Sequence, residues 1–169
     1  MRACFVRHGE TDWNREGRLQ GHTATSLNAT GIWQTRQCAE RLVGEGWDVI
    51  LSSPLQRARE SAHILSAYTG VPHFVSPLFT ELDYGQWNGQ KKELLITNHT
   101  FIKWYRIEIN KLEKLVKKEW EALIHTYKND AVIVVTHGLV IQQIEKVLNR
   151  KSQPDSEVIS NGSFINVQV

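Results

Sequence analysis

The sequence predicts a three-layer α/β domain, with helices on both sides of a sheet. Short apolar, β-prone runs alternate along the chain with segments in which apolar residues recur every three or four positions. The most apolar run, 131–136, is hydrophobic on both of its faces, which is typical of a strand covered on both sides. The 169 residues suffice for a single domain that buries about two-thirds of its unfolded surface.

The first predicted strand spans residues 3–6, which are apolar and β-prone, and we expect it to be central in the sheet. A polar loop over 9–28 follows. Thr30 is the candidate N-cap of the first helix, because its hydroxyl can accept an N–H group that is free at a helix start. Gly44 or Gly46 is expected to end this helix.

A second strand is predicted over 47–51, where an apolar run ends in Ser-Ser-Pro. Helical spacing returns over 55–68 and is stopped by Gly70 and Pro72. Residues 74–75 belong to a short third strand, which completes the first half of the alternating pattern.

The segment 91–128 predicts an amphipathic helix after a loop that contains Gly85 and Gly89. Its apolar positions recur at steps of three and four: Ile109, Leu112, Leu115, Val116, Trp120 and Leu123. Its other face carries lysines that we expect to be solvated: Lys111, Lys114, Lys117 and Lys118.

The last part of the chain predicts one buried strand, one helix and one edge strand. Residues 131–136 form the buried strand, and 139–148 return to helical spacing. After a polar loop through Pro154, residues 163–169 alternate in polarity as an edge strand does.

The composition is that of an ordinary globular protein, with 41% hydrophobic and 22% charged residues. A net charge of +2 is too small to indicate a nucleic-acid partner or an anionic membrane surface. No apolar run approaches the ~20 residues that a membrane-spanning helix needs. The chain starts directly with a strand pattern and shows no signal peptide, so we expect a cytoplasmic location.

The cysteines and histidines show no spacing typical of a metal site. Cys4 and Cys38 fall in a predicted strand and a predicted helix, which favours buried, reduced thiols. The other histidines are not grouped either: His22, His63, His73, His99 and His125. We therefore expect neither a metal nor another cofactor.

Two predicted strands end in the same dipeptide. His8-Gly9 follows the first strand and His137-Gly138 follows the strand 131–136. Ligands of open α/β sheets bind at the carboxyl ends of the strands. Both imidazoles are thus expected at one edge of the sheet, which is the candidate active site.

Basic and acidic residues near the other strand ends indicate phosphate chemistry. Arg7 adjoins the first histidine, and Arg57 opens the helix after the second strand. Guanidinium groups bind phosphate oxygens bidentately. Cations beside His8 would keep its ring neutral and able to attack, and Glu81, in the loop after the third strand, could protonate the departing oxygen.

Each residue also has an ordinary structural interpretation when it is taken alone. His8 or His137 could be a core or loop histidine, Arg57 a solvated helix arginine, and Glu81 a loop or capping carboxylate with Asp83 as a nearby competitor. The joint order and spacing of the motifs favours the functional interpretation.

Together the motifs resemble those of the histidine phosphatase superfamily, in its phosphoglycerate mutase-like branch. They follow the family's order over nearly the whole chain: Val6-Arg7-His8-Gly9-Glu10-Thr11, Asp12-Trp13-Asn14, Arg18-Leu19-Gln20-Gly21-His22, Leu51-Ser52-Ser53-Pro54-Leu55-Gln56-Arg57-Ala58, Glu81-Leu82-Asp83-Tyr84-Gly85-Gln86-Trp87-Asn88-Gly89, Thr136-His137-Gly138 and Asn161-Gly162-Ser163.

The resemblance implies a role for each catalytic candidate. His8 would be the nucleophile that becomes phosphohistidine. Arg7, Arg57 and His137 would bind the phosphoryl group, and His137 would also help to hold charge in the transition state. Glu81 would protonate the leaving oxygen and then activate water.

The resemblance also implies substrate contacts and a sheet type. Asn14 would contact the phosphate, as could the hydroxyl of Thr11. The backbone of Gln20 and Gly21 would line the mouth of the site. The family's sheet is mixed and mainly parallel, with one antiparallel edge strand, and 163–169 lies near that edge in sequence.

The sequence departs from the family in the region about 90–128, which contains no Gly or Pro and predicts a shortened lid. Lys92 and Arg106 only faintly match residues that hold a substrate carboxylate in cofactor-dependent mutases, and surface positions are the favoured interpretation. The tryptophans near site-forming segments could line an aromatic wall, although core packing is favoured for most: Trp13, Trp87 and Trp104.

A shortened lid excludes water poorly, so metal-independent hydrolysis of a small phosphomonoester is the favoured activity. Phosphoryl transfer of the phosphoglycerate mutase type is the alternative, and a non-catalytic phosphate-binding protein is a third. A glutamate in an intact loop favours ester substrates, whose leaving oxygen needs a proton, over phosphohistidine. Sugar phosphates, a nucleotide-loop phosphate of cobalamin synthesis and short phosphorylated acids all remain open, as does the oligomeric state.

Overall fold

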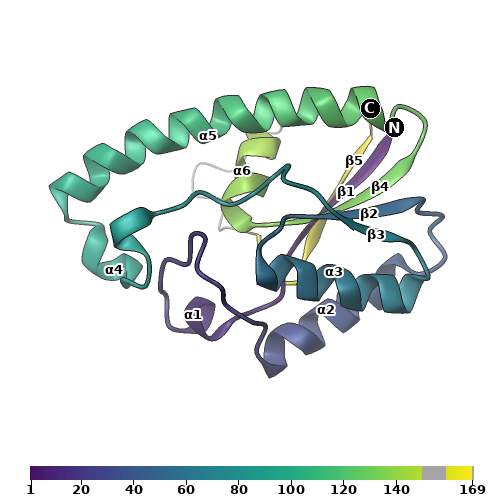
Figure 1. Ribbon diagram of the computed structural model, residues 1–169, viewed down its shortest axis with the longest axis horizontal. Coiled ribbons are helices and arrows are strands. Elements are labelled where there is room, and N and C mark those ends of the chain that lie inside the picture. Colours follow the sequence, from purple (N-terminus) through teal and green to yellow (C-terminus); the bar gives the residue numbers. More distant parts are fainter. Residues whose placement is uncertain (150–158, 169) are drawn as a thin grey trace.

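The computed structural model describes residues 1–149 and 159–168 and shows a mixed, mainly parallel sheet between two layers of helices (Figure 1). The strand order is β3-β2-β4-β1-β5, and only β5 runs antiparallel to its neighbour. The strands are β1 (Arg2–Arg7), β2 (Val49–Ser52), β3 (His73–Val75), β4 (Ala131–Thr136) and β5 (Phe164–Gln168). The predicted fold class is confirmed, including the antiparallel edge strand.

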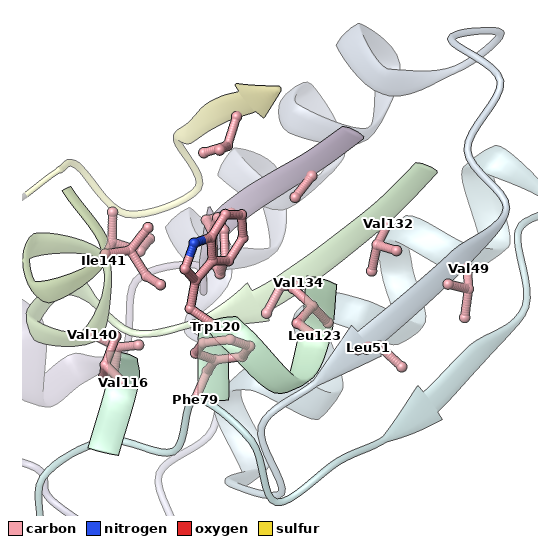
Figure 2. Close-up of a cluster of buried hydrophobic side chains, with 14 of the residues drawn as sticks. Val49, Leu51, Phe79, Val116, Trp120, Leu123, Val132, Val134, Val140 and Ile141 are labelled. Carbon is pink, nitrogen blue, oxygen red and sulfur yellow. The ribbon is translucent and has the colours of Figure 1, made fainter. Parts of the chain in front are cut away.

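Successive residues of each strand point to opposite helix layers, because side chains alternate along an extended chain. On one face, Phe5 and Val134 pack against α5 and α6, and Figure 2 shows this cluster. On the other face, Val6 and Ile133 pack against α2 and α3. The helices are α1 (Asp12–Arg15), α2 (Ala29–Leu42), α3 (Gln56–Thr69), η1 (Gly85–Trp87, a 3₁₀ turn), α4 (Lys92–Leu95), α5 (His99–Thr126) and α6 (Gly138–Val147).

The start of α2 corrects one prediction, because Asn28 and not Thr30 is its N-cap. The side chain of Asn28 accepts the backbone N–H of Gly31 at 2.8 Å, whereas Thr30 is exposed within the first turn. Asn satisfies a free N–H at a helix start at least as well as Thr does, so the helix begins earlier. The preceding loop also contains a helix that was not predicted, α1, which Thr11 caps.

The charged segment 91–128 forms two helices instead of one. α4 ends before Asn98, whose side chain accepts the N–H of Phe101 and caps α5. Of the predicted apolar face of α5, Leu112, Val116, Trp120 and Leu123 are buried, Ile109 is partly buried, and Leu115 is 48% exposed. All four lysines expected at the surface are exposed.

The remaining boundaries agree with the sequence patterns to within about two residues. Gly70 ends α3 with φ of 72°, a left-handed conformation that glycine adopts without strain. The loop through Pro154 and the final residue, Val169, lie outside the described residues. Within the described part of the chain, no helix combines the length and apolar character needed to cross a bilayer.

The two cysteines are free thiols, both buried on one face of the sheet, as predicted. Burial raises the pKa of Cys38 to about 12 and that of Cys4 still further, so both are protonated at neutral pH.

Candidate active site

His8 lies just beyond the end of β1, at the carboxyl edge of the sheet. Its Nδ1 is 2.7 Å from the carbonyl oxygen of Gly9, so this nitrogen carries the proton and donates it. Nε2 then carries the lone pair, and it accepts the Nε–H of Arg57, with 3.3 Å between the two nitrogens.

The environment of His8 keeps the imidazole neutral. Burial lowers its pKa well below the ordinary value, and the positive charges of Arg57 and Arg7 lower it further. A neutral imidazole with one defined free nitrogen is a nucleophile that is ready at neutral pH.

Gly9 allows the loop after β1 to pack directly against the start of α2. A Cβ atom at this position would collide with the carbonyl oxygen of Gly31. The Gly9 N–H also donates to the Oγ of Ser61, at 3.1 Å. The close packing of Gly9 against Gly31 fixes the position of the Gly9 carbonyl. That carbonyl in turn determines which nitrogen of His8 carries the proton.

Arg57 is in the first turn of α3 and is only 1% exposed. Its guanidinium donates to the carbonyl oxygens of Gly21, at 2.8 Å, and Thr23, at 3.3 Å. Burial lowers its pKa to about 10, with Glu81 acting in the opposite direction, so the group is still a cation at neutral pH. Arg57 is thus a buried positive charge beside His8. It is not the solvated helix arginine that its position alone would suggest.

His137 follows β4 and lies against His8, with ring centroids 5.2 Å apart. Its Nε2 is 2.8 Å from the Oγ of Ser53, which already accepts the N–H of Leu55. When the Ser53 hydroxyl donates to Nε2, the ring proton lies on Nδ1. No described residue partners this buried Nδ1, which is a donor available to a ligand.

Arg7 ends β1 and supplies a second unpaired donor. Its Nη1 donates to the carbonyl of Ile159 at 2.6 Å, but its buried Nε has no partner among the described residues. The Asn161-Gly162 turn holds this strand end, because its amides donate to the carbonyls of His8 and Arg7 at 3.0 Å each.

Glu81 lines the same cavity and has a raised pKa. Burial is the main cause, while the Leu82 N–H, which donates to its Oε1, and the nearby cations oppose the shift. Asp83, the alternative carboxylate, does not line the cavity: it is exposed, binds Asn88 and the N–H of Gly85, and has a lowered pKa. The geometry thus favours Glu81 as the carboxyl group that can hold a proton.

Five of the seven residues predicted to bind the substrate line the cavity: Arg7, Asn14, Gln20, Gly21 and Arg57. His137 and Thr11 are not among the lining residues. The buried hydroxyl of Thr11 donates to the Oε1 of Gln20, at 2.9 Å, and accepts the backbone N–H of Asn14, at 3.2 Å, within the cap of α1. The structure therefore corrects the predicted phosphate contact of Thr11, because its hydroxyl is used to orient two residues that do face the cavity.

The cavity has a volume of about 230 Å³, which suits a small ligand. Besides Arg7 and Arg57, two further cations line the cavity, Arg18 and Lys92, and an apolar wall is formed by Ile96, Phe101, Tyr105 and Leu139. Lys92 is exposed, as predicted, and also lines the cavity, whereas Arg106 is exposed and lines no part of it.

The predicted aromatic wall contains none of Trp13, Trp87 and Trp104, because no tryptophan is among the residues that line the cavity. Trp87 and Trp104 pack against Phe101, with ring centroids 5.5 and 5.9 Å apart. Sequence reasoning missed Phe101 and Tyr105 because an amphipathic helix without a motif supplies them. Ser53 was within the quoted Ser-Ser-Pro motif, but only the fold reveals its contact with His137.

Among the described residues, no group of three or more His, Cys, Asp or Glu side chains has a geometry that could hold a metal ion. The cavity is lined by arginine and lysine cations and by the neutral imidazole of His8. Such groups bind phosphate oxygens and stabilise charge on a transferring phosphoryl group.

Comparisons with known proteins give a matching family model and several similar phosphatases. The family model "Histidine phosphatase superfamily (branch 1)" matches residues 3–167. The uncharacterized phosphatase PhoE of Bacillus subtilis is 36% identical over 144 residues, which cover 83% of this chain and 74% of the relative. The metal-independent phosphoserine phosphatase of Arabidopsis thaliana is 32% identical over 180 aligned positions, covering 98% and 73%. The phosphoserine phosphatase of Entamoeba histolytica, solved with 3-phosphoglyceric acid, superposes with a TM-score of 0.84 at 25% identity, covering 98% and 89%.

Proposed function

Since the chain belongs to the histidine phosphatase superfamily, we propose that it hydrolyses small phosphomonoesters through a phosphohistidine on His8. The observation that supports this most is the arrangement around the Nε2 of His8. One neutral nitrogen, one buried guanidinium and two unpaired donors, on Arg7 and His137, converge within one edge of the sheet.

In the first step, the Nε2 of His8 attacks phosphorus and the bond from phosphorus to the ester oxygen breaks. Glu81 gives its proton to the departing oxygen, so the product leaves as a neutral alcohol and Glu81 becomes a carboxylate. The guanidinium groups of Arg7 and Arg57, with the Nδ1–H of His137, hold the charge on the equatorial oxygens.

In the second step, a water molecule attacks the phosphohistidine. The Glu81 carboxylate takes a proton from that water, the bond from phosphorus to Nε2 breaks, and inorganic phosphate forms. Both His8 and Glu81 return to their starting states. No metal ion is assigned a step in this scheme.

The far part of the cavity supports a substrate of small size. Arg18 and Lys92 could bind a second negative group on the alcohol, such as a carboxylate, and the apolar wall would contact its carbon chain. The relatives named for phosphoserine hydrolysis make phosphoserine a first compound to test.

The test is phosphate release from a panel of phosphomonoesters in EDTA, by the wild-type protein and by His8→Ala. The panel includes phosphoserine, 3-phosphoglycerate and an alkyl phosphate, and 2-phosphoglycerate is measured alongside free phosphate. Release that survives EDTA and is lost in His8→Ala is the expected result. Isomerisation without release would instead establish a mutase, and equal release by His8→Ala would reject His8 as the nucleophile.

A further inference from the structure

Phe79, two residues before Glu81, has a backbone conformation that bulky residues seldom adopt. Its φ is 58°, in the left-handed region, although its side chain is only 1% exposed. This conformation is strained for a residue with a Cβ atom and persists only where the surroundings enforce it. The loop that carries the candidate acid therefore leaves the core through an enforced turn.

Three contacts from three different elements enforce this turn. The Phe79 N–H donates to the Oε2 of Glu119 on α5, at 2.8 Å, and its carbonyl accepts from the Oγ1 of Thr136, at 2.6 Å. Its ring packs edge-on against Phe5 of β1, with centroids 5.4 Å apart, and belongs to the same buried cluster as Trp120 (Figure 2). The anchors on Phe5 and Thr136 lie on the two strands that end at His8 and His137.

The carboxyl group of Glu119 has no role in either step of the proposed hydrolysis. It is 8% exposed, lies outside the cavity and has a pKa raised by burial, an effect that its hydrogen bond from Phe79 opposes. Glu113 and Glu121, on the same helix, are exposed. Burying a carboxyl group is unfavourable unless it is hydrogen-bonded, and the described partner here is the strained N–H of Phe79.

We propose that Glu119 is a positioning residue for the acid step, acting through Phe79 to hold the carboxyl group of Glu81 in the cavity. Without its acceptor, the Phe79 N–H would be buried and unpaired, and the loop would relax from the left-handed conformation. Glu81 would then be displaced from the departing oxygen, while the phosphate-binding groups would stay in place. This inference rests on the proposed role of Glu81.

The dependence of kcat/KM on the leaving group tests the proposal, because this parameter covers the steps up to release of the alcohol. An alkyl phosphate needs the proton of a general acid, and 4-nitrophenyl phosphate needs it far less. Glu119→Ala should lower kcat/KM for the alkyl ester about tenfold more than for the nitrophenyl ester, a part of the 10²–10⁴ that a general acid supplies. Glu119→Gln keeps an acceptor oxygen and should restore most of the alkyl-ester rate. Glu121→Gln, exposed on the same helix, is the matched control.

Thr136→Val provides a second route to the same loop, should Glu119→Ala not fold. It removes the donor to the Phe79 carbonyl with little change in shape and should show the same selective loss, whereas Thr136→Ser should not. Equal losses for both esters in Glu119→Ala and Thr136→Val would indicate a merely structural role and overturn the proposal, as would no loss. Glu81→Gln is measured in parallel. If Glu81→Gln does not lower kcat/KM selectively for the alkyl ester, the proposed acid is wrong. If Glu81→Gln shows this selective loss and Glu119→Ala does not, only the positioning role is wrong.

Discussion

Replacing Arg57 with glutamine should change both the rate and the pH dependence of catalysis. The guanidinium is 1% exposed, its Nε is 3.3 Å from the nucleophilic nitrogen of His8, and it carries a positive charge at neutral pH. Glutamine removes that charge and retains a side chain of similar polarity. The same substitution at Arg59, exposed on the same helix, is the control.

In the proposed mechanism Arg57 is a buried donor to the transferring phosphoryl group, so the rate should fall when it is lost. Loss of one such donor typically lowers the rate by about 10²–10³. The stability of the fold should be affected less. The carbonyls of Gly21 and Thr23 and the hydroxyl of Thr25 each lose a hydrogen-bond donor, which costs about 1 kcal/mol of stability each. Removing a buried cation is favourable and offsets part of this loss. We expect a folded protein with a loss of stability of no more than about 3 kcal/mol.

The pH dependence should move in a defined direction. His8 is active when neutral, and its pKa is lowered by burial and then by Arg57, so activity should persist well below pH 6.5 and be lost as pH falls through that lowered pKa. Removing the Arg57 charge raises the pKa, and the acidic limb should shift to higher pH.

Two measurements follow the shift: the pH profile of kcat/KM, and an NMR titration of the His8 ring in the free protein, which avoids ionisation of the substrate. A lower rate with an unchanged His8 titration would refute the argument that Arg57 keeps this imidazole neutral.

Three further results are expected. In the proposed mechanism Glu81 acts as an acid only while protonated. Its pKa is raised, chiefly by burial, and wild-type activity should be lost as pH rises through that pKa. Glu81→Gln should therefore abolish this alkaline limb in the pH profile of kcat/KM. An alkaline limb that persists in the pH profile would assign the acid elsewhere. Ser53→Ala should lower kcat/KM roughly fivefold, the equivalent of about 1 kcal/mol, because the His137 ring loses the hydrogen bond that holds its tautomer. Steady-state kinetics should show this loss while the midpoint of thermal unfolding stays unchanged. Gly9→Ala should destabilise the fold by about 1–3 kcal/mol in urea unfolding, because its Cβ meets the Gly31 carbonyl; unchanged stability would contradict this packing.

Much of the fold could be predicted from local pattern alone. Short apolar runs, the alternating pattern of 163–169 and helical spacing indicate the five strands and the four long helices, because those elements owe their stability to burial of one or two faces. The short elements were missed. α1 depends on the capping box of Thr11 and Asn14, and the break before α5 depends on the Asn98 cap, and neither shows a long periodic pattern.

The candidate site could be predicted where a functional residue directly follows a recognisable strand. His8 and His137 each follow an apolar strand, and the parallel pairing of β1 with β4 brings them together. The supporting contacts were not predictable, because they join positions distant in sequence. Ser53 with His137, and Glu119 with Phe79, become neighbours only after the sheet and α5 have packed.

The account depends most on a covalent phosphoryl group on His8. Wild-type protein mixed with a radiolabelled phosphomonoester and quenched within milliseconds should carry an acid-labile, base-stable label. Peptide mapping should place that label on His8, and His8→Ala should carry none. A label on another residue, or full turnover by His8→Ala, would contradict the account.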